Sequence, residues 1–336
     1  MRLSEIGGEF GFLERLSQRH SGVTPSNLDV GNGDDAAVFR TGTGSSTVVS
    51  TDLIVEGIHF KREWSCPFDI GWKSAAVNLS DIAAMGAKPA YAFVSLAIPD
   101  YVDVEFLDTF YDGFCANLIE FGVVIAGGDT SRSLSGLVIS VTLIGHVPEG
   151  QQLTREGASV GDCIVVTGSL GNSRAGLELL SRFGKDQAHR ISPDLVTLHL
   201  RPSARTDFGM DSALHTLVTA AMDVSDGLCD DVNKLCRHSG VGARIELECV
   251  PVSTNLRNCS NNLLMPPVEY ALAGGEDYEL LMCVAPGRVG ELQDVGKRHS
   301  LQITQIGAIA ENGVMYVRGD GTVVEEIDAM GWDHFR

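Results

Sequence analysis

The sequence predicts an α/β protein of the α+β kind that is divided into two domains. Its 336 residues exceed what a single typical hydrophobic core can organise. Helix-like and strand-like apolar segments alternate through the first half, which is the pattern of an α+β domain. Pro148, Glu149 and Gly150 then interrupt the apolar pattern before a second series of elements begins. We therefore expect one domain over residues 1–148 and a second over residues 149–336.

The first half contains three predicted helices and several short strands. Phe10, Leu13 and Leu16 share one face of a helix predicted over 4–20. Segments rich in apolar residues predict two further helices, over 68–86 and 103–121. Short apolar runs bounded by Gly, Ser, Thr or Pro are typical of strands, and they occur at 38–39, 48–49, 91–98, 123–126 and 137–147.

The second half begins with a turn at Val160-Gly161-Asp162 and continues with mixed elements. The first apolar run after the turn predicts a strand over 163–167. Apolar residues at helical spacing predict helices over 171–183, 192–200, 203–214 and 227–238. Runs with strand-like composition predict four more strands, at 243–247, 278–285, 303–309 and 314–318.

The charge balance restricts the partners of the protein. With 25 Lys and Arg against 44 Asp and Glu, the formal net charge is −19. Such a surface repels nucleic acid and anionic membrane, so we expect neither as a partner. It also repels any phosphate compound unless metal ions intervene, although solubility alone is an alternative explanation of the charge.

The cysteines and the apolar segments favour a cytoplasmic location. None of the eight cysteines forms a C-x-x-C pair, which disfavours a zinc ribbon or a redox motif and leaves reduced thiols as the expectation. Residues 1–8 lack the basic and apolar regions of a signal peptide. No window approaches the ~18 uninterrupted apolar residues of a membrane span.

Five short segments share one pattern, in which aspartate accompanies glycine or serine beside an apolar element. They lie at 31–35, 50–52, 78–81, 127–130 and 223–226. Each segment alone has an ordinary explanation, such as a turn or an aspartate that caps a helix. Together they supply hard oxygen ligands on glycine-rich turns, which suit Mg²⁺ bridging phosphates better than zinc or iron. The sequence therefore predicts a metal-dependent phosphoryl-transfer site.

Two of these segments carry a further spatial argument. Side chains alternate along a strand, so Ser50 and Asp52 share a face. A carboxylate at the end of this apolar strand must be paired or bind a metal, because an isolated buried charge is costly. Asn78 and Asp81 fall on one stripe, with Ser74, of an otherwise apolar helix. This pattern favours a site over a solvated helix face.

The segment at 223–226 has two explanations. Asp223 and Asp226 can chelate one ion, or Ser225 and Asp226 can cap the helix that follows.

Two common nucleotide-binding motifs are absent from the sequence, because the chain has neither a G-x-x-x-x-G-K-[ST] loop nor a G-x-G-x-x-G motif. Without a Walker lysine, metals and an arginine must neutralise phosphate. Arg155 is a candidate for that arginine, and a surface charge in a turn is the alternative.

The segments, taken in order, resemble the thiamine-monophosphate kinase family of the aminoimidazole-ribonucleotide-synthetase-like superfamily. The resemblance runs from about Gly8 to Phe335. Its motifs are Gly33-Asp34-Asp35-Ala36, Ser50-Thr51-Asp52 with Glu56-Gly57 and His59-Phe60, 78–86, 127–130, Leu153-Thr154-Arg155, 223–228, 274–280 and Trp332-Asp333-His334-Phe335. N-L-S-D-I-A-A-M-G and G-G-E-D-Y-E-L are specific when they occur together, and the W-x-H-F tail separates this family from its relatives.

The resemblance implies an N-terminal domain that binds ATP and Mg²⁺ and forms a homodimer through its sheet, followed by a C-terminal PurM-like α/β domain. ATP and several Mg²⁺ ions are then expected in the cleft between the domains, with thiamine monophosphate as the second substrate. The implied metal ligands are Asp35, Ser50, Thr51, Asp52, Asp81, Asp129, Asp223 and Asp226. The implied ATP contacts are Tyr111, Gly128, Asp129, Arg155 and Ser225. The implied thiamine contacts are His59, Glu276 and Trp332, and the residues expected to act in catalysis are Asp52, Asp129, Arg155 and Asp226.

The implied reaction fits these residue types. A phosphate monoester has its second pKa at about 6, so the acceptor is mostly ionised at neutral pH and needs no general base. Repulsion between two anions is the obstacle, and metals offset it. The alternatives are a selenide, water dikinase-like or purine-pathway synthetase-like enzyme of the same superfamily, or an acidic divalent-ion binder without catalysis.

Overall fold

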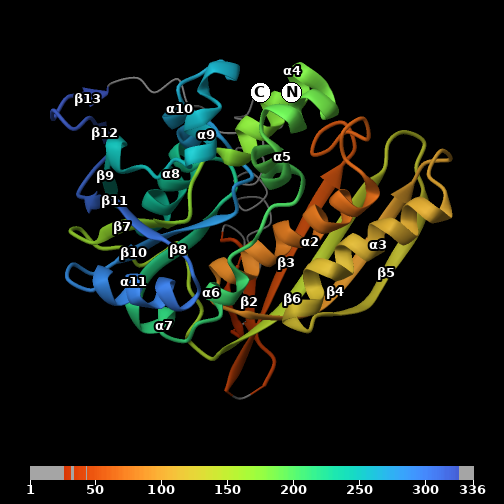
Figure 1. Ribbon diagram of the computed structural model, residues 1–336. Coiled ribbons are helices and arrows are strands. Elements are labelled where there is room, and N and C mark those ends of the chain that lie inside the picture. Colours follow the sequence, from red (N-terminus) through yellow and green to blue (C-terminus); the bar gives the residue numbers. More distant parts are fainter. Residues whose placement is uncertain (1–25, 32–33, 43, 325–336) are drawn as a thin grey trace, which may run out of the picture.

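Two β-sheets, one from each half of the chain, organise the protein in its computed structural model (Figure 1). The structure describes residues 26–31, 34–42 and 44–324. Helices pack on both sheets, so the predicted α/β fold class is confirmed. The helix predicted over 4–20 lies outside the described residues.

The first sheet has six strands in the order β1-β2-β3-β6-β4-β5. The strands are β1 (Leu28–Val30), β2 (Ala37–Arg40), β3 (Ser45–Val55), β4 (Lys88–Ile98), β5 (Val124–Arg132) and β6 (Val138–Pro148). Antiparallel pairing of β3 with β6 runs over the whole of both strands, from Ser45 opposite Pro148 to Val55 opposite Val138. The edge strand β5 pairs only with β4, and this pair is parallel.

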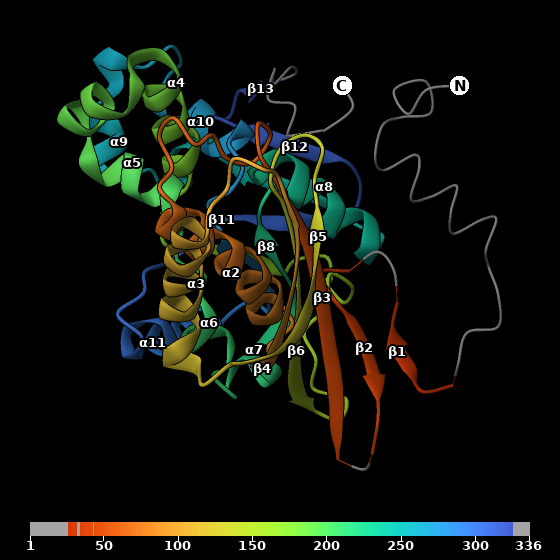
Figure 2. The ribbon, with the colours of Figure 1, turned by 90° about the vertical axis from the view of Figure 1, so that its right-hand side faces the viewer.

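Two helices, α2 (Pro67–Ala84) and α3 (Val104–Leu118), cover one face of this sheet (Figure 2). A short 3-10 helix, Ile119–Phe121, continues α3. The two helices approach closely at two glycines: a Cβ on Gly71 would lie 1.9 Å from the Phe110 carbonyl oxygen, and one on Gly113 would lie 2.0 Å from that of Phe68. Any larger residue at either position would force the helices apart.

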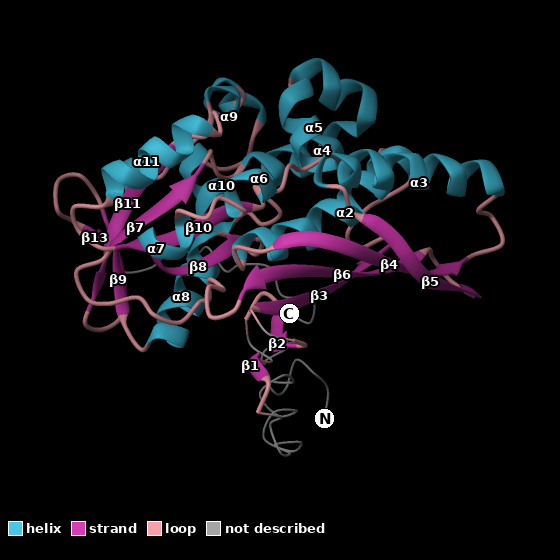
Figure 3. Ribbon diagram, turned by 90° about the horizontal axis from the view of Figure 1, so that it is seen from below, coloured by secondary structure: helices cyan, strands magenta, loops and turns pink. Residues whose placement is uncertain are grey.

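No helix among the described residues covers the opposite face of β3, β4, β5 and β6 (Figure 3). Large apolar side chains are exposed there, including Leu53 on β3 and Tyr91 and Phe93 on β4. The strands alternate between this outer face and a buried inner face that packs against α2. The sheet therefore presents an apolar surface of the kind that usually marks an interface.

The second sheet has seven strands in the order β13-β12-β9-β11-β7-β10-β8. They are β7 (Cys163–Thr167), β8 (Val218–Val224), β9 (Gly242–Glu246), β10 (Glu279–Val284), β11 (Ile303–Ala310), β12 (Val314–Val317) and β13 (Val323–Val324). The longer helices of this half are α4 (Asn172–Ile191), α5 (Pro193–Leu200), α8 (Leu228–Ser239) and α11 (Val289–Arg298). Shorter helices are α6 (Thr206–Gly209), α7 (Leu214–Leu217), α9 (Thr254–Asn258) and α10 (Pro267–Ala273), with 3-10 turns at Leu247–Cys249 and Ser260–Asn262.

Helix α2 joins the two halves, because it packs against β3 and β6 of the first sheet and also against α6 and β8 of the second half. Its C-terminal end packs against α6, where a Cβ on Gly209 would lie 2.5 Å from the Ala83 carbonyl oxygen. The Ser80 hydroxyl of α2 also donates a hydrogen bond to the Asp223 carboxylate at the end of β8. None of the helices in the described ranges combines the length and apolar character needed to cross a membrane.

Several predicted boundaries were wrong. The strands predicted to end at Val49 and Ala126 continue to Val55 and Arg132, so Asp52 and Asp129 lie inside strands. The helix predicted over 203–214 is two short helices, α6 and α7, because Gly209 must approach Ala83 and the chain turns after it. Strand β8 was not predicted, since Thr219, Ala220 and Ala221 weaken its strand-like pattern.

Candidate functional site

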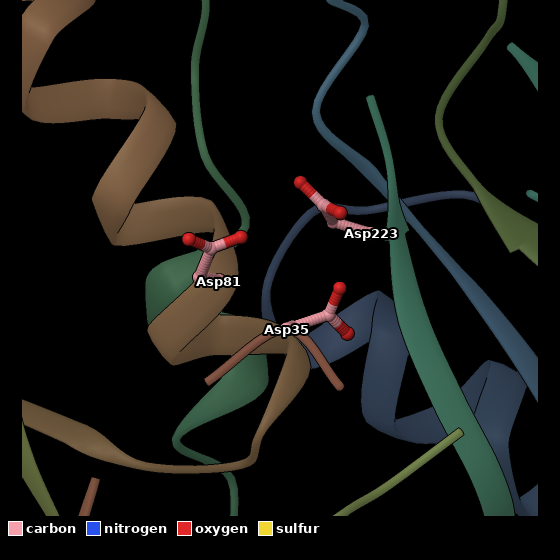
Figure 4. A group of neighbouring side chains, drawn as sticks. All are labelled: Asp35, Asp81 and Asp223. Atoms are coloured by element: carbon pink, nitrogen blue, oxygen red, sulfur yellow. The ribbon is translucent and has the colours of Figure 1, made fainter. Parts of the chain in front are cut away.

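Three carboxylates from distant parts of the chain converge where the two halves meet (Figure 4). Asp35 precedes β2, Asp81 lies in α2, and Asp223 lies in β8. One carboxylate oxygen of each lies within 4.8 Å of one from each of the others. Two of the four predicted acidic segments in the first half thus meet the one in the second half, and these three residues form the acidic cluster.

Asp34 and Asp35 have different roles, although they are adjacent. One Asp34 oxygen accepts a hydrogen bond from the Arg155 backbone N–H at 3.0 Å, and the other accepts from the Asp35 N–H at 2.9 Å. Asp35 instead points into the acidic cluster and pairs with the Arg155 guanidinium through Oδ1. No helix follows the pair, so the alternative of a helix cap at this segment was wrong.

Asp52 joins the cluster from the inner face of β3. Its side chain forms a hydrogen bond with the side chain of Asp81. Asp35 and Asp226 are close enough for their charges to disfavour ionisation of Asp52. Ser50, two residues earlier on the same face, donates a hydrogen bond to Asp81 Oδ2. The predicted sharing of a face by Ser50 and Asp52 is confirmed by the burial pattern of β3.

Burial and the proximity of like charges raise the pKa values of three carboxyl groups in this site. Burial, reinforced by Asp35 and Asp226, raises the pKa of Asp52 to about 6. Burial raises the pKa of Asp81 well above its usual value, and the neighbouring Asp52 adds to this shift. Burial and then the charge of Asp35 likewise raise the pKa of Asp223. A bound cation would reverse these shifts, because it favours the ionised form of each carboxylate.

Buried oxygen atoms in and beside the cluster are suited to bind a hard cation. Asp35 Oδ2 and the side-chain oxygen of Asn78, three residues before Asp81 on α2, are two of the buried side-chain atoms without a hydrogen-bond partner among the described residues. Buried oxygens of this kind normally have a partner, so both are available as ligands to a cation. Carboxylate and amide oxygens are the ligands that Mg²⁺ takes, whereas zinc prefers sulfur and imidazole. The chemistry of the donors therefore fits Mg²⁺.

A tight turn carries Ser225 and Asp226 beside the cluster. Asp231, in the first turn of α8, accepts hydrogen bonds of 3.1, 3.2 and 3.2 Å from the backbone N–H groups of residues 225–227. Helix α8 starts after Gly227, so the alternative that Ser225 or Asp226 caps it was wrong. Lys234 pairs with both Asp226 and Asp231, which places one ammonium at the edge of the acidic region.

His59 lies near enough to Glu276 for a charge on one to act on the other, although 217 positions separate them in the numbering. Burial opposes ionisation of Glu276, but the neighbouring Lys73 ammonium outweighs it and lowers the pKa of the carboxyl group below its usual value. The Val55 backbone N–H donates to His59 Nδ1 at 3.0 Å. Because Nδ1 accepts, a neutral His59 ring carries its proton on Nε2.

Other predicted residues lie away from the acidic cluster within one chain. The Thr51 side chain is on the outer face, where it contacts Thr142 at 3.1 Å. Tyr111 packs in α3 against Phe110 and Phe114. Gly128 and Asp129 lie on β5, whose residues are all exposed. Trp332 and the tail motif lie outside the described residues.

The strand register separates Asp129 from Asp52. Asp52 is opposite Val141, which is opposite Val94, which is opposite Gly128, so Asp129 is three strands away. At about 4.8 Å per strand this amounts to roughly 14 Å. Asp129 pairs with Ser95 on the outer face, whereas Asp52 is on the inner face. Gly128 itself is required by packing, because a Cβ there would lie 1.9 Å from the Val94 carbonyl oxygen.

Sequence reasoning did not predict how three cations pair with acidic residues. Lys73 pairs with Glu276 at 2.9 Å, Lys234 pairs with Asp226, and Arg205 pairs with Glu279. The signal for Lys73 was present, since a single lysine interrupts a helix of Ile, Gly, Trp, Ser and Ala. Lys234 and Arg205 lie in segments of mixed polarity, so their sequence neighbours give no comparable signal.

Comparison with known proteins extends over the whole chain. The model of the AIR synthase related protein N-terminal domain matches residues 33–147, and that of the C-terminal domain matches residues 159–320. The chain is 39% identical to thiamine-monophosphate kinase of Escherichia coli strain K12 over 98% of both sequences. It is 35% identical to thiamine-monophosphate kinase of Aquifex aeolicus over 100% of both. The solved structure of AaThiL complexed with AMPPCP and TMP aligns with a TM-score of 0.85 at 35% identity, covering 100% of this chain and 99% of that one.

Proposed function

The chain belongs to the thiamine-monophosphate kinase family of AIR-synthase-related proteins, and we propose on that premise that it transfers the γ-phosphoryl group of ATP to thiamine monophosphate, forming thiamine diphosphate. The observation that carries the proposal is the acidic cluster between the two halves. The superfamily alternatives, a selenide, water dikinase or a purine-pathway synthetase, are not favoured, because full-length relatives are thiamine-monophosphate kinases.

Mg²⁺ is the ion that we propose for the acidic cluster. Two unit charges about 4 Å apart repel by roughly 4 kcal/mol at an effective dielectric of 20, so an anionic acceptor and ATP need a cation between them. Bound Mg²⁺ would supply that charge and stabilise an in-line transfer. The proposed ligands at the cluster are Asp35, Ser50, Asp52, Asp81, Asp223 and Asp226. Thr51 and Asp129 are proposed as ligands as well, and both lie on the outer face of the sheet in their own chain.

The remaining groups divide between the two substrates. Arg155 lies beside Asp35, and its guanidinium can contact phosphate oxygens there. We assign Tyr111, Gly128, Asp129, Arg155 and Ser225 to ATP, and His59, Glu276 and Trp332 to thiamine monophosphate. Within these sets, Asp52, Asp129, Arg155 and Asp226 are the residues proposed to act on the reacting phosphates.

The acceptor phosphate needs no general base in this scheme. It is mostly ionised at neutral pH, because its second pKa is about 6. His59 presents Nε2–H as a donor, since Nδ1 accepts from the Val55 N–H. We propose that this N–H contacts the acceptor, while the Glu276 carboxylate faces its cationic end.

Asp129 can serve such a site only through a second copy of the chain. Within one chain it is about three strands, or roughly 14 Å, from Asp52 and on the opposite face of the sheet. The edge strand β5 and the uncovered apolar face with Leu53, Tyr91 and Phe93 offer a surface for a homodimer. We propose that the partner's β5 brings its Gly128 and Asp129 to the acidic cluster.

We propose a division into domains at 1–148 and 149–336, which is supported by the end of β6 at Pro148 and the start of β7 at Cys163. The N-terminal unit then carries the dimer surface and most metal ligands, and the PurM-like C-terminal unit completes the cleft. A cytoplasmic location is proposed as well, and it agrees with eight free cysteines and with ATP as co-substrate.

The proposal is tested by incubating the purified full-length chain with ATP and MgCl₂ and separating the products by chromatography. The acceptors are thiamine monophosphate, thiamine, and buffer alone. Thiamine diphosphate should form from thiamine monophosphate only, in step with ADP. ATP hydrolysis that does not depend on the acceptor, with no thiamine diphosphate, would exclude the proposed reaction.

A further inference from the structure

Lys73 occupies an unusual environment for a lysine. It lies inside helix α2, where its side chain is 4% exposed, and its Nζ is 2.9 Å from Glu276 Oε2. A buried ammonium is costly unless it is paired, so this contact stabilises both groups. Glu276 belongs to the loop before β10 in the second half, so the pair spans the two halves of the protein.

A second contact holds the same carboxylate oxygen. His199 of α5 places Nδ1 at 3.4 Å from Glu276 Oε2 and at 3.0 Å from Ser173 Oγ. Burial and then the charge of Lys73 lower the pKa of His199 to about 3, so its ring is neutral. Lys73 therefore supplies the positive charge that compensates the Glu276 carboxylate. The contact with His199 restricts the orientation of that carboxylate.

The backbone of Glu276 is held in an uncommon conformation. Glu276 has φ of 64° and Tyr278 has φ of 52°, both in the left-handed region that non-glycine residues rarely adopt. The Glu276 N–H donates to the Ser225 carbonyl at 2.7 Å, and the Tyr278 N–H donates to the Val224 carbonyl at 2.9 Å. The loop is thus attached by its backbone to the segment that carries Asp223 and Asp226.

Helix α2 relates this carboxylate to the acidic cluster. Asp81 follows Lys73 by eight positions on the same helix, which is about 12 Å along its axis. The helix contacts Glu276 in its first half, through Lys73, and the acidic cluster in its last turn, through Asp81. Glu276 borders a cavity that is also lined by Ser173, Ser203 and Arg205, and a quarter of its side chain is exposed.

We propose that Lys73 is a positioning residue that fixes the Glu276 carboxylate at a set distance and direction from the acidic cluster. The inference rests on the proposed function, in which Glu276 faces the cationic end of the acceptor and the cluster serves its phosphate end. Lys73 does not touch the reacting atoms. It acts through Glu276, so its loss should weaken acceptor binding and leave ATP binding unchanged.

The test measures steady-state kinetics of Lys73→Met and Lys73→Arg in the full-length protein. Lys73→Met should raise KM for thiamine monophosphate about tenfold, which corresponds to 1.4 kcal/mol, while KM for ATP stays within about twofold. Lys73→Arg keeps the charge and should restore most of the lost affinity. Lys297→Met is the matched control, because Lys297 pairs with Asp294 on the surface with 75% of its side chain exposed.

Two further measurements separate positioning from general damage to the fold. In a Glu276→Gln background, Lys73→Met should change KM for thiamine monophosphate by less than about twofold, because the carboxylate it acts through is gone. The groups facing Glu276 are Lys73 of α2, His199 of α5 and His59. Lys73 lowers the pKa of the Glu276 carboxyl group, so the acid limb of the pH profile of KM should move to higher pH in Lys73→Met. Lys73→Gln repeats these measurements if Lys73→Met does not fold.

The outcomes distinguish the inference from the function on which it rests. If the wild type turns over thiamine monophosphate while Lys73→Met and Lys73→Gln leave its KM unchanged, the inference is wrong and the function stands. An equal rise of KM in the wild-type and Glu276→Gln backgrounds would also overturn it. A wild type that forms no thiamine diphosphate overturns both.

Discussion

Ser80 of α2 donates a hydrogen bond of 2.7 Å to Asp223 Oδ2 at the end of β8, and this bond joins the two halves at the acidic cluster. Both residues are buried. The next residue along α2, Asp81, and the Ser80-bound Asp223 then face each other together with Asp35. The metal site that we propose is therefore assembled only when the two halves are packed together.

The Asp81→Asn variant should lose activity and gain stability when no metal is present. Burial and the neighbouring carboxylates raise the pKa of Asp81, so the ionised form is unfavourable in the empty cluster. Replacing it by a neutral amide should raise the melting temperature in a chelator by about 2–4 °C per kcal/mol relieved. Calorimetry with and without Mg²⁺ measures this, and the added Mg²⁺ should stabilise the wild type more than the variant. A variant that is less stable than wild type in chelator would contradict the placement of Asp81 among like charges.

The stabilisation by Mg²⁺ should decrease as the pH falls. The folded-state pKa of Asp52 is about 6, raised from 3.8, so its protonated form stabilises the metal-free protein below about 3.8 and this contribution is lost as the pH rises through about 6. Mg²⁺ replaces the protons, so its effect on the melting temperature should be largest near pH 8 and smaller near about pH 5. Melting curves in Mg²⁺ and in chelator across this range provide the measurement. A metal effect that is independent of pH would show that these carboxylates are not the ligands.

Two inactive variants should complement each other if Asp129 acts across the dimer. Asp81→Asn and Asp129→Asn each remove a proposed ligand, and a heterodimer of the two retains one site with both ligands intact. Co-expression with two different affinity tags and tandem purification yields this heterodimer, which should have about half of the wild-type activity. Each homodimer should be inactive. A heterodimer as inactive as its parents would place Asp81 and Asp129 of one chain in the same site.

The tautomer of His59 makes a prediction about its replacements. Nδ1 accepts from the Val55 N–H, so Nε2–H is the group available to the acceptor. A glutamine amide reaches the Nε2 position better than an asparagine amide does. His59→Gln should therefore have a KM for thiamine monophosphate closer to wild type than His59→Asn, by about tenfold if one hydrogen bond is recovered. The reverse order would assign the contact to Nδ1.

Much of the acidic site was predictable from sequence because its chemistry is local. Asp35, Asp81 and Asp223 each lie within two residues of glycine or serine beside an apolar element, and buried carboxylates in such positions require a partner or a metal. Their convergence was not predictable in the same way, since it depends on α2 packing between the halves and on strand β8, which was not predicted.

Asp129 shows where local patterns fail. Gly127 and Gly128 favour a turn, yet both are in strand β5, because Gly128 allows the backbone to approach Val94 of β4. The side to which Asp129 points depends on the register of that pair, which depends on the whole sheet. The pairing of Lys73 with Glu276 is a similar case, since 203 positions separate the two residues and only the packing of α2 brings them together.

The central claim is that the acidic cluster supports transfer of the γ-phosphoryl group to thiamine monophosphate. The most direct measurement follows a radioactive label from the γ-phosphate of ATP in a single turnover, with wild type, with Asp81→Asn, and with wild type in chelator. The label should appear in thiamine diphosphate for wild type with Mg²⁺ and in neither of the other reactions. Label that is released only as inorganic phosphate, or an undiminished transfer by Asp81→Asn, would contradict the claim.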